Sequence, residues 1–384
     1  MTKSLFVEIR GVQFVNKGAE LMLLACMDAI LQQYPQAQIV LAPNRNSPYR
    51  SRALLGALQK VMFRVRGFDF NVLSYLIPKS VRAVLRERFG LVFEPDIDVV
   101  IDASGFAYGD QWGGRNVKAM VSELHRLRRQ HKIYVFMPQA FGPFSAPAER
   151  HLLANALPKA ALVCARDSQS FAYLQPLCPQ PPLVQYGDFT NLVLPVRPQN
   201  LPEVRYGLII PNSAMVNPKK NYNANWIENY LRVLQLHVVA MKALGIQPVV
   251  LNHEGPADLN ICLKISQMND NLQVVNESDA RVVKGWISTA AVVVSSRFHG
   301  CVSALSSGVP CLASSWSHKY EMLFQEYGAE FAMLDPAMTT QDVMATLQMA
   351  LAAEHVTQLQ QAAARFKQQS QQLWQQVFLK MNVL

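Results

Sequence analysis

The chain has 384 residues, of which 50% are hydrophobic and 16% are charged. This composition excludes a disordered chain, and the length favours two domains, because a domain usually has about 100 to 200 residues. Lys and Arg outnumber Asp and Glu by 36 to 27, but most of this charge lies in one segment. Residues 45–88 carry +8, whereas the rest of the chain carries +1 out of the total of +9. A uniformly basic nucleic-acid-binding protein is therefore disfavoured, and we expect no nucleic acid partner.

The six cysteines are scattered without a CxxC pair, and several lie in apolar runs such as residues 161–165. This predicts buried thiols rather than a disulfide framework or a zinc site, and no metal is expected. Residues 1–10 lack the apolar core of a secretion signal, and no run of about 18 uncharged apolar residues is present to span a bilayer. We therefore expect a cytoplasmic protein.

Short apolar runs alternate with amphipathic segments of helical length over the first half of the chain. The runs are apolar throughout rather than alternating, which is typical of parallel strands covered on both faces. The predicted strands are residues 5–9, 38–41, 99–101, 133–137 and 161–164, and the predicted helices are residues 18–33, 116–130, 147–157 and 168–174.

Three prolines within residues 194–202 interrupt this alternation and predict a linker over residues 194–204. A second series follows, with strands predicted at residues 206–210, 248–251, 272–275 and 291–295, and helices at 224–244, 257–268 and 279–288. Two such series predict an α/β protein with two Rossmann-like domains, residues 1–193 and 205–338, that face each other across a cleft. The Gln- and Ala-rich residues 339–384 keep helical spacing of apolar positions and predict a packed helical segment.

Residues 11–20 form the first candidate site, directly after the first predicted strand. Gly18 lies at the strand-to-helix turn, Asn16 and Lys17 at the helix start, and Glu20 in the first turn. A helix start presents N–H groups that suit an anion. The segment matches neither dinucleotide nor P-loop patterns, so a glycine-assisted turn with Glu20 capping the helix is an equally open interpretation.

The strand at 99–101 leads into Asp102 and a glycine-rich loop that contains Gly105. Ligands bind at this end of parallel strands, so Asp102 is a candidate base or sugar contact. The alternative is that Asp102 hydrogen-bonds its own loop. We favour the functional interpretation because an unpaired carboxylate there is costly.

Arg166 follows the strand at 161–164, where an arginine can grip a carboxylate or phosphate. An ion pair with the adjacent Asp167 is the favoured alternative, and Asp188 is interpreted first as a turn residue.

The most informative segment follows the strand at 291–295. Two hydroxyls, a guanidinium and an imidazole begin a short helix there, and an ammonium begins the next helix; the residues are Ser295, Ser296, Arg297, His299 and Lys319. A lone histidine is usually structural, but this combination at consecutive strand ends predicts an active site.

Together these motifs resemble the polysaccharide pyruvyl transferase family in the right order from about residue 6 to residue 328. The similar segments are residues 16–20, Gly105, 139–144, 165–167, 187–188 and 296–300, continuing to Lys319. The resemblance implies a GT-B-like fold, with the acceptor on the N-terminal domain and phosphoenolpyruvate on the C-terminal one. It also implies pyruvyl transfer, as a ketal, to a sugar of a surface polysaccharide or its lipid-linked precursor. Departures lie at Ala19 and Ala103, where relatives usually carry glycine.

The residues suit that chemistry without a cofactor. Phosphoenolpyruvate needs fixed cations, for which Arg297, Lys319 and Arg166 are candidates, with Ser295 or Ser296 assisting. An imidazole donates protons near neutrality, so His299 is the candidate general acid, and Asp102 or Glu20 the candidate base.

Two further interpretations stay open. The same fold serves glycosyltransferases that use a nucleotide sugar, for which residues 252–254 are a candidate contact. The basic segment 45–88 mixes cations with apolar residues, which suits the anionic inner face of the cell membrane as well as an ordinary basic helix and loop. A noncatalytic, membrane-docked member of the fold is the remaining alternative.

Overall fold

The computed structural model describes residues 5–65, 68–179, 181–221, 223–315 and 319–382. The chain forms two compact units: unit 1 comprises residues 1–15, 22–189 and 369–384, and unit 2 comprises residues 16–21 and 190–368. The main boundary therefore lies a few residues before the predicted linker. The predicted C-terminal segment 339–384 is divided, because its last residues group with unit 1 and the others with unit 2.

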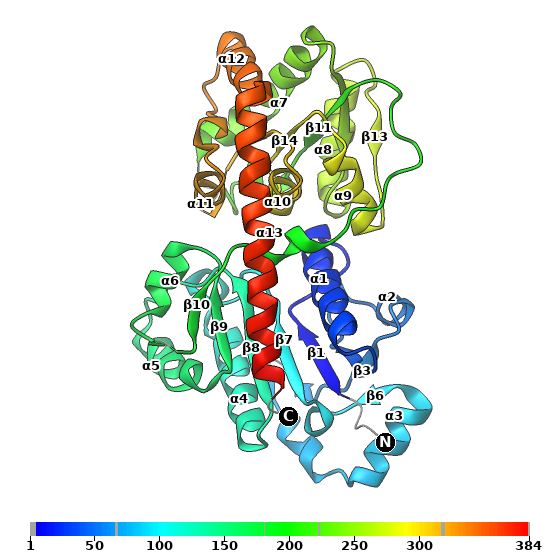
Figure 1. Ribbon diagram of the computed structural model, residues 1–384, viewed down its shortest axis with the longest axis vertical. Coiled ribbons are helices and arrows are strands. Elements are labelled where there is room, and N and C mark those ends of the chain that lie inside the picture. The colour runs from blue at the N-terminus through cyan, green and yellow to red at the C-terminus, as the bar shows by residue number, and fades with distance from the viewer. Residues whose placement is uncertain (1–4, 66–67, 180, 222, 316–318, 383–384) are drawn as a thin grey trace. The chain divides into compact units, whose positions relative to one another are not determined.

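Unit 1 contains an eight-stranded sheet in which every neighbouring pair is parallel. Its strands are β1 (Phe6–Arg10), β2 (Gln38–Leu41), β3 (Leu58–Lys60), β6 (Leu91–Val92), β7 (Val99–Asp102), β8 (Ile133–Gln139), β9 (Leu162–Ala165) and β10 (Leu183–Gln185). They lie in the order β10-β9-β8-β7-β1-β2-β3-β6, so the strand order reverses between β1 and β7. Figure 1 shows helices flanking this sheet.

The helices of unit 1 are α1 (Lys17–Gln33), whose first turn groups with unit 2, α2 (Tyr49–Leu54), α3 (Lys79–Phe89), α4 (Gly114–Arg129), α5 (Pro147–Ala156) and α6 (Ser168–Leu174). A short antiparallel pair, β4 (Arg64–Val65) and β5 (Phe68–Asp69), precedes the 3₁₀ helix η1 (Asn71–Leu76).

Unit 2 repeats the plan with five parallel strands: β11 (Tyr206–Ile210), β12 (Gln247–Leu251), β13 (Val274–Val275), β14 (Val292–Ser295) and β15 (Cys311–Ala313). Their order is β13-β12-β11-β14-β15. Its helices are α7 (Ala224–Ala243), α8 (Gly255–Gln267), α9 (Ala280–Ser288), α10 (Phe298–Ser306), α11 (Lys319–Glu326), α12 (Thr340–Leu351) and α13 (Ala353–Met381), the last extending into unit 1.

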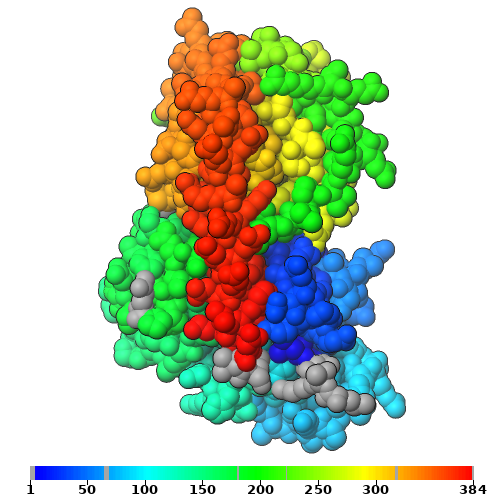
Figure 2. Space-filling model, in the orientation of Figure 1, coloured from blue at the N-terminus to red at the C-terminus, as the bar shows by residue number. Residues whose placement is uncertain are grey.

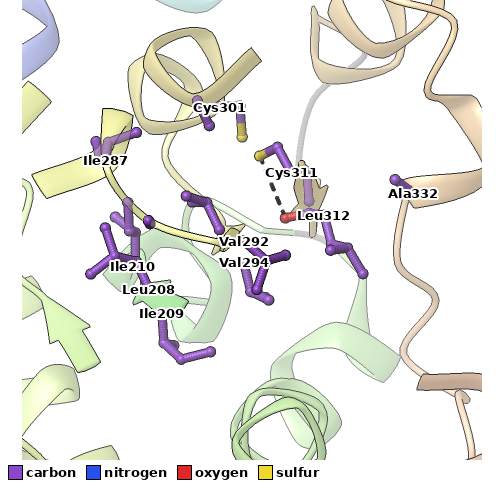
Figure 3. Packing of buried hydrophobic residues seen from close by; sticks show 14 of the residues in the cluster. Leu208, Ile209, Ile210, Ile287, Val292, Val294, Cys301, Cys311, Leu312 and Ala332 are labelled. Atoms are coloured by element: carbon purple, nitrogen blue, oxygen red, sulfur yellow. Dashed lines mark hydrogen bonds between the residues drawn. The ribbon is translucent and has the colours of Figure 1, made fainter. Parts of the chain in front are cut away.

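The prediction of two Rossmann-like α/β units is confirmed. The strands β7, β8, β9, β11 and β14 are buried at every position, as their continuous apolar character indicates. Figure 3 shows how Leu208, Ile210, Val292 and Val294 of neighbouring strands pack with Cys301 and Cys311 in the core of unit 2. All six cysteines are buried and free.

Within the described ranges, no helix combines the length and apolar character that crossing a bilayer requires.

A buried charge cluster links β1, β3 and α4 in unit 1. Lys60 on β3 donates to Glu8 on β1 at 2.6 Å and also contacts Glu123 on α4, which pairs with Arg10. Although burial opposes it, Lys60 and Arg10 hold the pKa of the Glu123 carboxyl at about 2. Burial raises the pKa of Glu8 to about 7, with Lys60 opposing the shift. The cluster therefore has one firmly ionised carboxylate and one that is protonated more readily than in water.

Glu8→Gln should flatten the dependence of stability on pH. In the wild type, the folded state holds the Glu8 proton up to about pH 7, whereas the unfolded state loses it near pH 4.5. The stability that the Glu8 proton contributes is therefore complete below about pH 4.5 and is lost as the pH rises through about 7. Urea unfolding at about pH 5 and about pH 8 should show a loss on the order of 2 kcal/mol in the wild type that the variant lacks. Glu87→Gln, at an exposed position on α3, is the control, and equal pH dependence in Glu8→Gln and wild type would contradict the expectation.

Candidate functional site

The strand order of unit 2 reverses between β11 and β14, because β12 and β13 lie on one side of β11 and β15 lies beyond β14. At such a reversal the connections leave in opposite directions, and ligands bind at the carboxyl ends of the strands. Residues 296–299 follow β14 at this point, and residues 252–254 follow β12, on the other side of β11. The predicted active-site segment therefore lies at the place in unit 2 where the fold favours a ligand.

Arg297 is fixed at the start of α10 by two carboxylates. Its Nε and Nη2 each donate to Asp258 on α8 at 2.6 Å, and its Nη1 contacts Glu254. Burial lowers the pKa of Arg297 to about 10, which still leaves the guanidinium charged at neutral pH. Burial also raises the pKa of Asp258 to about 6, and the hydrogen bond from the N–H of Ser213 opposes that shift by favouring the carboxylate.

The start of α1 lies against the same residues of unit 2. Asn16 donates to Glu254 at 3.1 Å, and its side-chain oxygen accepts from the N–H of Gly18 at 2.9 Å. Lys17 donates to Glu20 at 2.6 Å and to the carbonyl of Ser278. Asn16 thus caps the helix, and the interpretation of Glu20 as a simple cap is wrong. Burial raises the pKa of Glu20, with Lys17 opposing the shift.

Gly18 is required by a close approach. A Cβ added there would lie 2.1 Å from Nδ1 of His299 and 2.3 Å from its Cγ, so any side chain would displace the imidazole. Gly18, which the sequence predicts to let a ligand approach the backbone, therefore lets the imidazole of His299 approach it. His299 lies in the first turn of α10, edge-on to the adjacent ring of Phe298.

Lys319, at the start of α11, extends over the Phe298 ring, with Nζ 5.2 Å from its centroid. This places its ammonium beside the segment that carries Arg297 and His299. Ser295 and Ser296, which precede Arg297, are fully buried. Ser295 accepts from the N–H of Arg297, and Ser296 bonds to Tyr230 and Ser314, so both serines position the segment rather than offer an exposed hydroxyl.

The other predicted site residues belong to unit 1. Asp102 is fully buried and accepts from the Tyr108 and Tyr134 hydroxyls and from the N–H and hydroxyl of Ser104. The loop-bonding interpretation of Asp102 is therefore the one that its contacts fit, and its carboxylate is not placed to act as a base. Gly105 adopts a φ of +69°, which favours glycine.

Arg166 lies 3.7 Å from Asp188 rather than pairing with Asp167, which caps α6 through the N–H of Ser170. The predicted Arg166–Asp167 pair is therefore wrong, and Asp188 is an ion-pair partner rather than a turn residue alone.

Three further residues lie near Arg297: His253 and Glu254, which belong to the 252–254 contact offered for a nucleotide sugar, and Asp258, which the sequence did not indicate. His253 is 2% exposed, and neither ring nitrogen has a hydrogen-bond partner among the described residues. Burial and the nearby charges of Arg297, His299 and Lys17 hold its pKa well below the usual range, so the imidazole is neutral. The polar residues 252–254 after a predicted strand were the available signal, whereas Asp258 was hidden inside a predicted helix.

Within the described residues, no group of three or more His, Cys, Asp or Glu side chains is arranged to hold a metal ion.

The chain belongs to the polysaccharide pyruvyl transferase family, whose model matches residues 16–318. It is therefore a member of a transferase family. Similar solved structures share its GT-B-type fold at low sequence identity, so they show the fold and not the substrate. No curated protein sequence matches the chain.

Two structures illustrate the shared fold. A UDP-GlcNAc 2-epimerase from Neisseria meningitidis, solved bound to UDP-GlcNAc, is 13% identical with a TM-score of 0.56, over 98% of this chain and 100% of that one. A UDP-glucosyltransferase from Polygonum tinctorium is 9% identical with a TM-score of 0.53, over 99% of both chains.

Asp258→Asn should destabilise unit 2, because it leaves the buried guanidinium of Arg297 without its two-pronged partner. Breaking a buried ion pair on one side costs about 3 kcal/mol, which urea unfolding would detect. Lys242→Ala, which breaks the exposed pair with Asp270, should cost less than about 1 kcal/mol. Equal stability of the two variants would show that the Asp258 contact does not hold Arg297.

Proposed function

We propose that this protein transfers the pyruvyl group of phosphoenolpyruvate to two hydroxyls of a sugar acceptor, as a ketal, on a surface polysaccharide or its lipid-linked precursor. Membership of the family supports the reaction class. The observation that carries the proposal is the placement of Arg297 and His299 at the strand-order reversal of unit 2, with Lys319 beside them.

The cations suit a donor that carries a phosphate and a carboxylate. Arg297 presents a planar guanidinium whose orientation is fixed from below by Asp258, and Lys319 supplies a second charge. A fixed guanidinium binds a carboxylate or phosphate with two parallel hydrogen bonds and loses little freedom in doing so. Both groups serve binding of the donor rather than proton transfer.

His299 is the general acid in this scheme. One acceptor hydroxyl oxygen bonds to C2 of phosphoenolpyruvate while C3 takes a proton from the imidazole. The second hydroxyl oxygen then bonds to C2 as the C2–O bond to phosphate breaks, and the proton of this hydroxyl leaves with the phosphate. Packing against Gly18 fixes the plane of the imidazole, which a directed proton transfer requires.

Glu20 is the better candidate for the base that takes the hydroxyl proton. The carboxylate oxygens of Asp102 are occupied by Ser104, Tyr108 and Tyr134, whereas Glu20 shares unit 2 with His299. Burial raises the pKa of Glu20, which makes its carboxylate a stronger proton acceptor near neutral pH.

His253 complements the cations as a neutral hydrogen-bonding group. Its two buried nitrogens are unsatisfied within the described residues, and a buried polar atom without a partner is costly. A donor oxygen bound beside Arg297 would satisfy one of them, so His253 is proposed to hold the donor without adding charge.

Glu254 is the partner of Arg297 that an anionic donor would replace. Its side chain is 27% exposed, whereas that of Asp258 is 0% exposed. An incoming carboxylate or phosphate can therefore take the Nη1 face of Arg297 without disturbing the Asp258 contact. The carboxylate of Glu254 would then stand in for the donor when none is bound.

Glu254→Gln should strengthen phosphoenolpyruvate binding about threefold to tenfold, because it removes a competing negative charge and keeps the side-chain shape. Isothermal titration calorimetry measures this, with Glu228→Gln, an exposed position on α7, as the control for lost charge. Weaker binding in Glu254→Gln would mean that Glu254 supports Arg297 rather than competing with the donor.

The reaction itself is tested by incubating the protein with phosphoenolpyruvate and candidate sugar acceptors, while following phosphate release and the mass of the acceptor. His299→Gln should abolish turnover yet still bind phosphoenolpyruvate, because the cations remain. His151→Gln, at an exposed position on α5, should behave as wild type. Near-normal turnover in His299→Gln would reject the general-acid assignment.

A thermal-shift comparison separates the alternatives. Stabilisation by phosphoenolpyruvate but not by UDP supports pyruvyl transfer, and a ligand at 100 times its Kd should add about 2.7 kcal/mol. The reverse result would favour a nucleotide-sugar glycosyltransferase, and stabilisation by neither would favour a noncatalytic member of the fold.

A further inference from the structure

Exposed apolar side chains are concentrated in one part of unit 1. Nineteen large apolar side chains are exposed in the described residues, and nine of them lie between residues 49 and 89. A surface normally exposes such residues singly, so a concentration of this kind marks a binding surface. Those on α3 do not belong to the core, because no residue of α3 is buried.

Six of the nine form what we call the apolar face, on η1 and α3. Val81 and Val84 lie three residues apart on α3, which places them on the same side of the helix. Leu76 is 79% exposed at the end of η1, three residues before the start of α3. Figure 1 shows α3 beside β6, the edge strand of the sheet, and Figure 2 shows this light-blue segment at the surface of unit 1. The members are Val72, Leu73, Leu76, Val81, Val84 and Phe89.

The cations of α3 are of two kinds: some contact the rest of unit 1 and others are exposed. Arg82 pairs with Asp96 at 3.0 Å, and Arg86 lies 4.9 Å above the ring of Phe6, so these two attach α3 to unit 1. Lys79 and Arg88 are exposed at the two ends of the helix. Glu87 is the single acidic residue between residues 70 and 89. The exposed charge on α3 is therefore positive in sum, with Lys79 and Arg88 against Glu87.

The segment's charge is also less exposed than its +8 suggests. Arg52 and Lys60 are buried, where Arg52 bonds to Gln59 and Lys60 joins the charge cluster with Glu8 and Glu123. The exposed cations of the segment include Arg45 near α2, Arg50 on α2, and Lys79 and Arg88 on α3.

We propose that the apolar face docks unit 1 on an anionic lipid bilayer. A bilayer interface accepts apolar side chains into its acyl boundary while its phosphate groups attract the flanking cations. A second copy of this chain fits less well, because its own apolar face would bring Lys79 and Arg88 against like charges. The proposal is independent of the reaction, since it uses none of the residues proposed to bind the donor.

Co-sedimentation of the full-length protein with vesicles tests this surface. The wild type should sediment with phosphatidylcholine vesicles that contain phosphatidylglycerol, and much less with pure phosphatidylcholine. Lys79→Glu/Arg88→Glu should weaken binding about tenfold or more, because two cations are reversed. The matched control is Arg128→Glu/Arg129→Glu, which makes the same charge change at exposed positions of α4 outside the apolar face.

Leu76→Ser/Val84→Ser tests the apolar part without changing charge, and it should also weaken binding while circular dichroism and thermal melting stay as in the wild type. Wild-type protein that stays in the supernatant with phosphatidylglycerol vesicles would overturn the proposal. So would equal binding by the two charge-reversal variants. A dimer seen by light scattering that Leu76→Ser/Val84→Ser dissociates would assign the face to a second copy instead.

Discussion

The contact between Arg297 and Asp258 is the interaction on which the candidate site depends. Asp258 enters from α8 and Arg297 from the end of β14, so the pair joins the two sides of the strand-order reversal in unit 2. Because two guanidinium nitrogens are held at 2.6 Å by a fully buried carboxylate, the third is presented in a fixed direction. The two residues that follow Arg297 also have defined contacts. The ring of Phe298 lies beneath the ammonium of Lys319, and the imidazole of His299 packs against Gly18.

The buried charges are arranged differently in the two units. In unit 1, Glu8, Lys60 and Glu123 face one another, and all three side chains are nearly inaccessible to solvent. Such a cluster fixes the positions of β1, β3 and α4, and none of its charges is offered to a ligand. In unit 2 the corresponding cluster is open on one side, at Glu254, and an unsatisfied imidazole lies nearby at His253. A charge cluster with an unsatisfied hydrogen-bonding group suits a site for an anion, because a cluster whose groups are all paired has no group left to bind one.

The sequence predicts the fold well where strands are long and apolar. The bounds of β2, β11 and α6 agree with the predicted ranges, because continuous apolar runs and a capping Asp167 mark them locally. The short strands β3 and β6 were not predicted, since Gln59 and Lys60 are polar and are buried only because distant residues pair with them. Likewise, Arg297 and His299 follow from one local motif, whereas the role of Asp258 becomes visible only when the fold brings α8 to Arg297.

The same reasoning explains why the role of Asp102 changes between sequence and structure. A carboxylate after a buried strand resembles a ligand contact as long as its partners are unknown. Those partners are Tyr108, six residues later, and Tyr134, on the neighbouring strand β8. Tyr108 lies in the loop and is covered by the alternative that Asp102 bonds its own loop, whereas no local pattern implies Tyr134, because an aromatic residue in an apolar strand is first interpreted as core. A strand-end carboxylate therefore indicates function only if the adjacent strands offer it no hydroxyl. Glu20 differs from Asp102, because its carboxylate pairs with the ammonium of Lys17 at the same helix start rather than with buried hydroxyls.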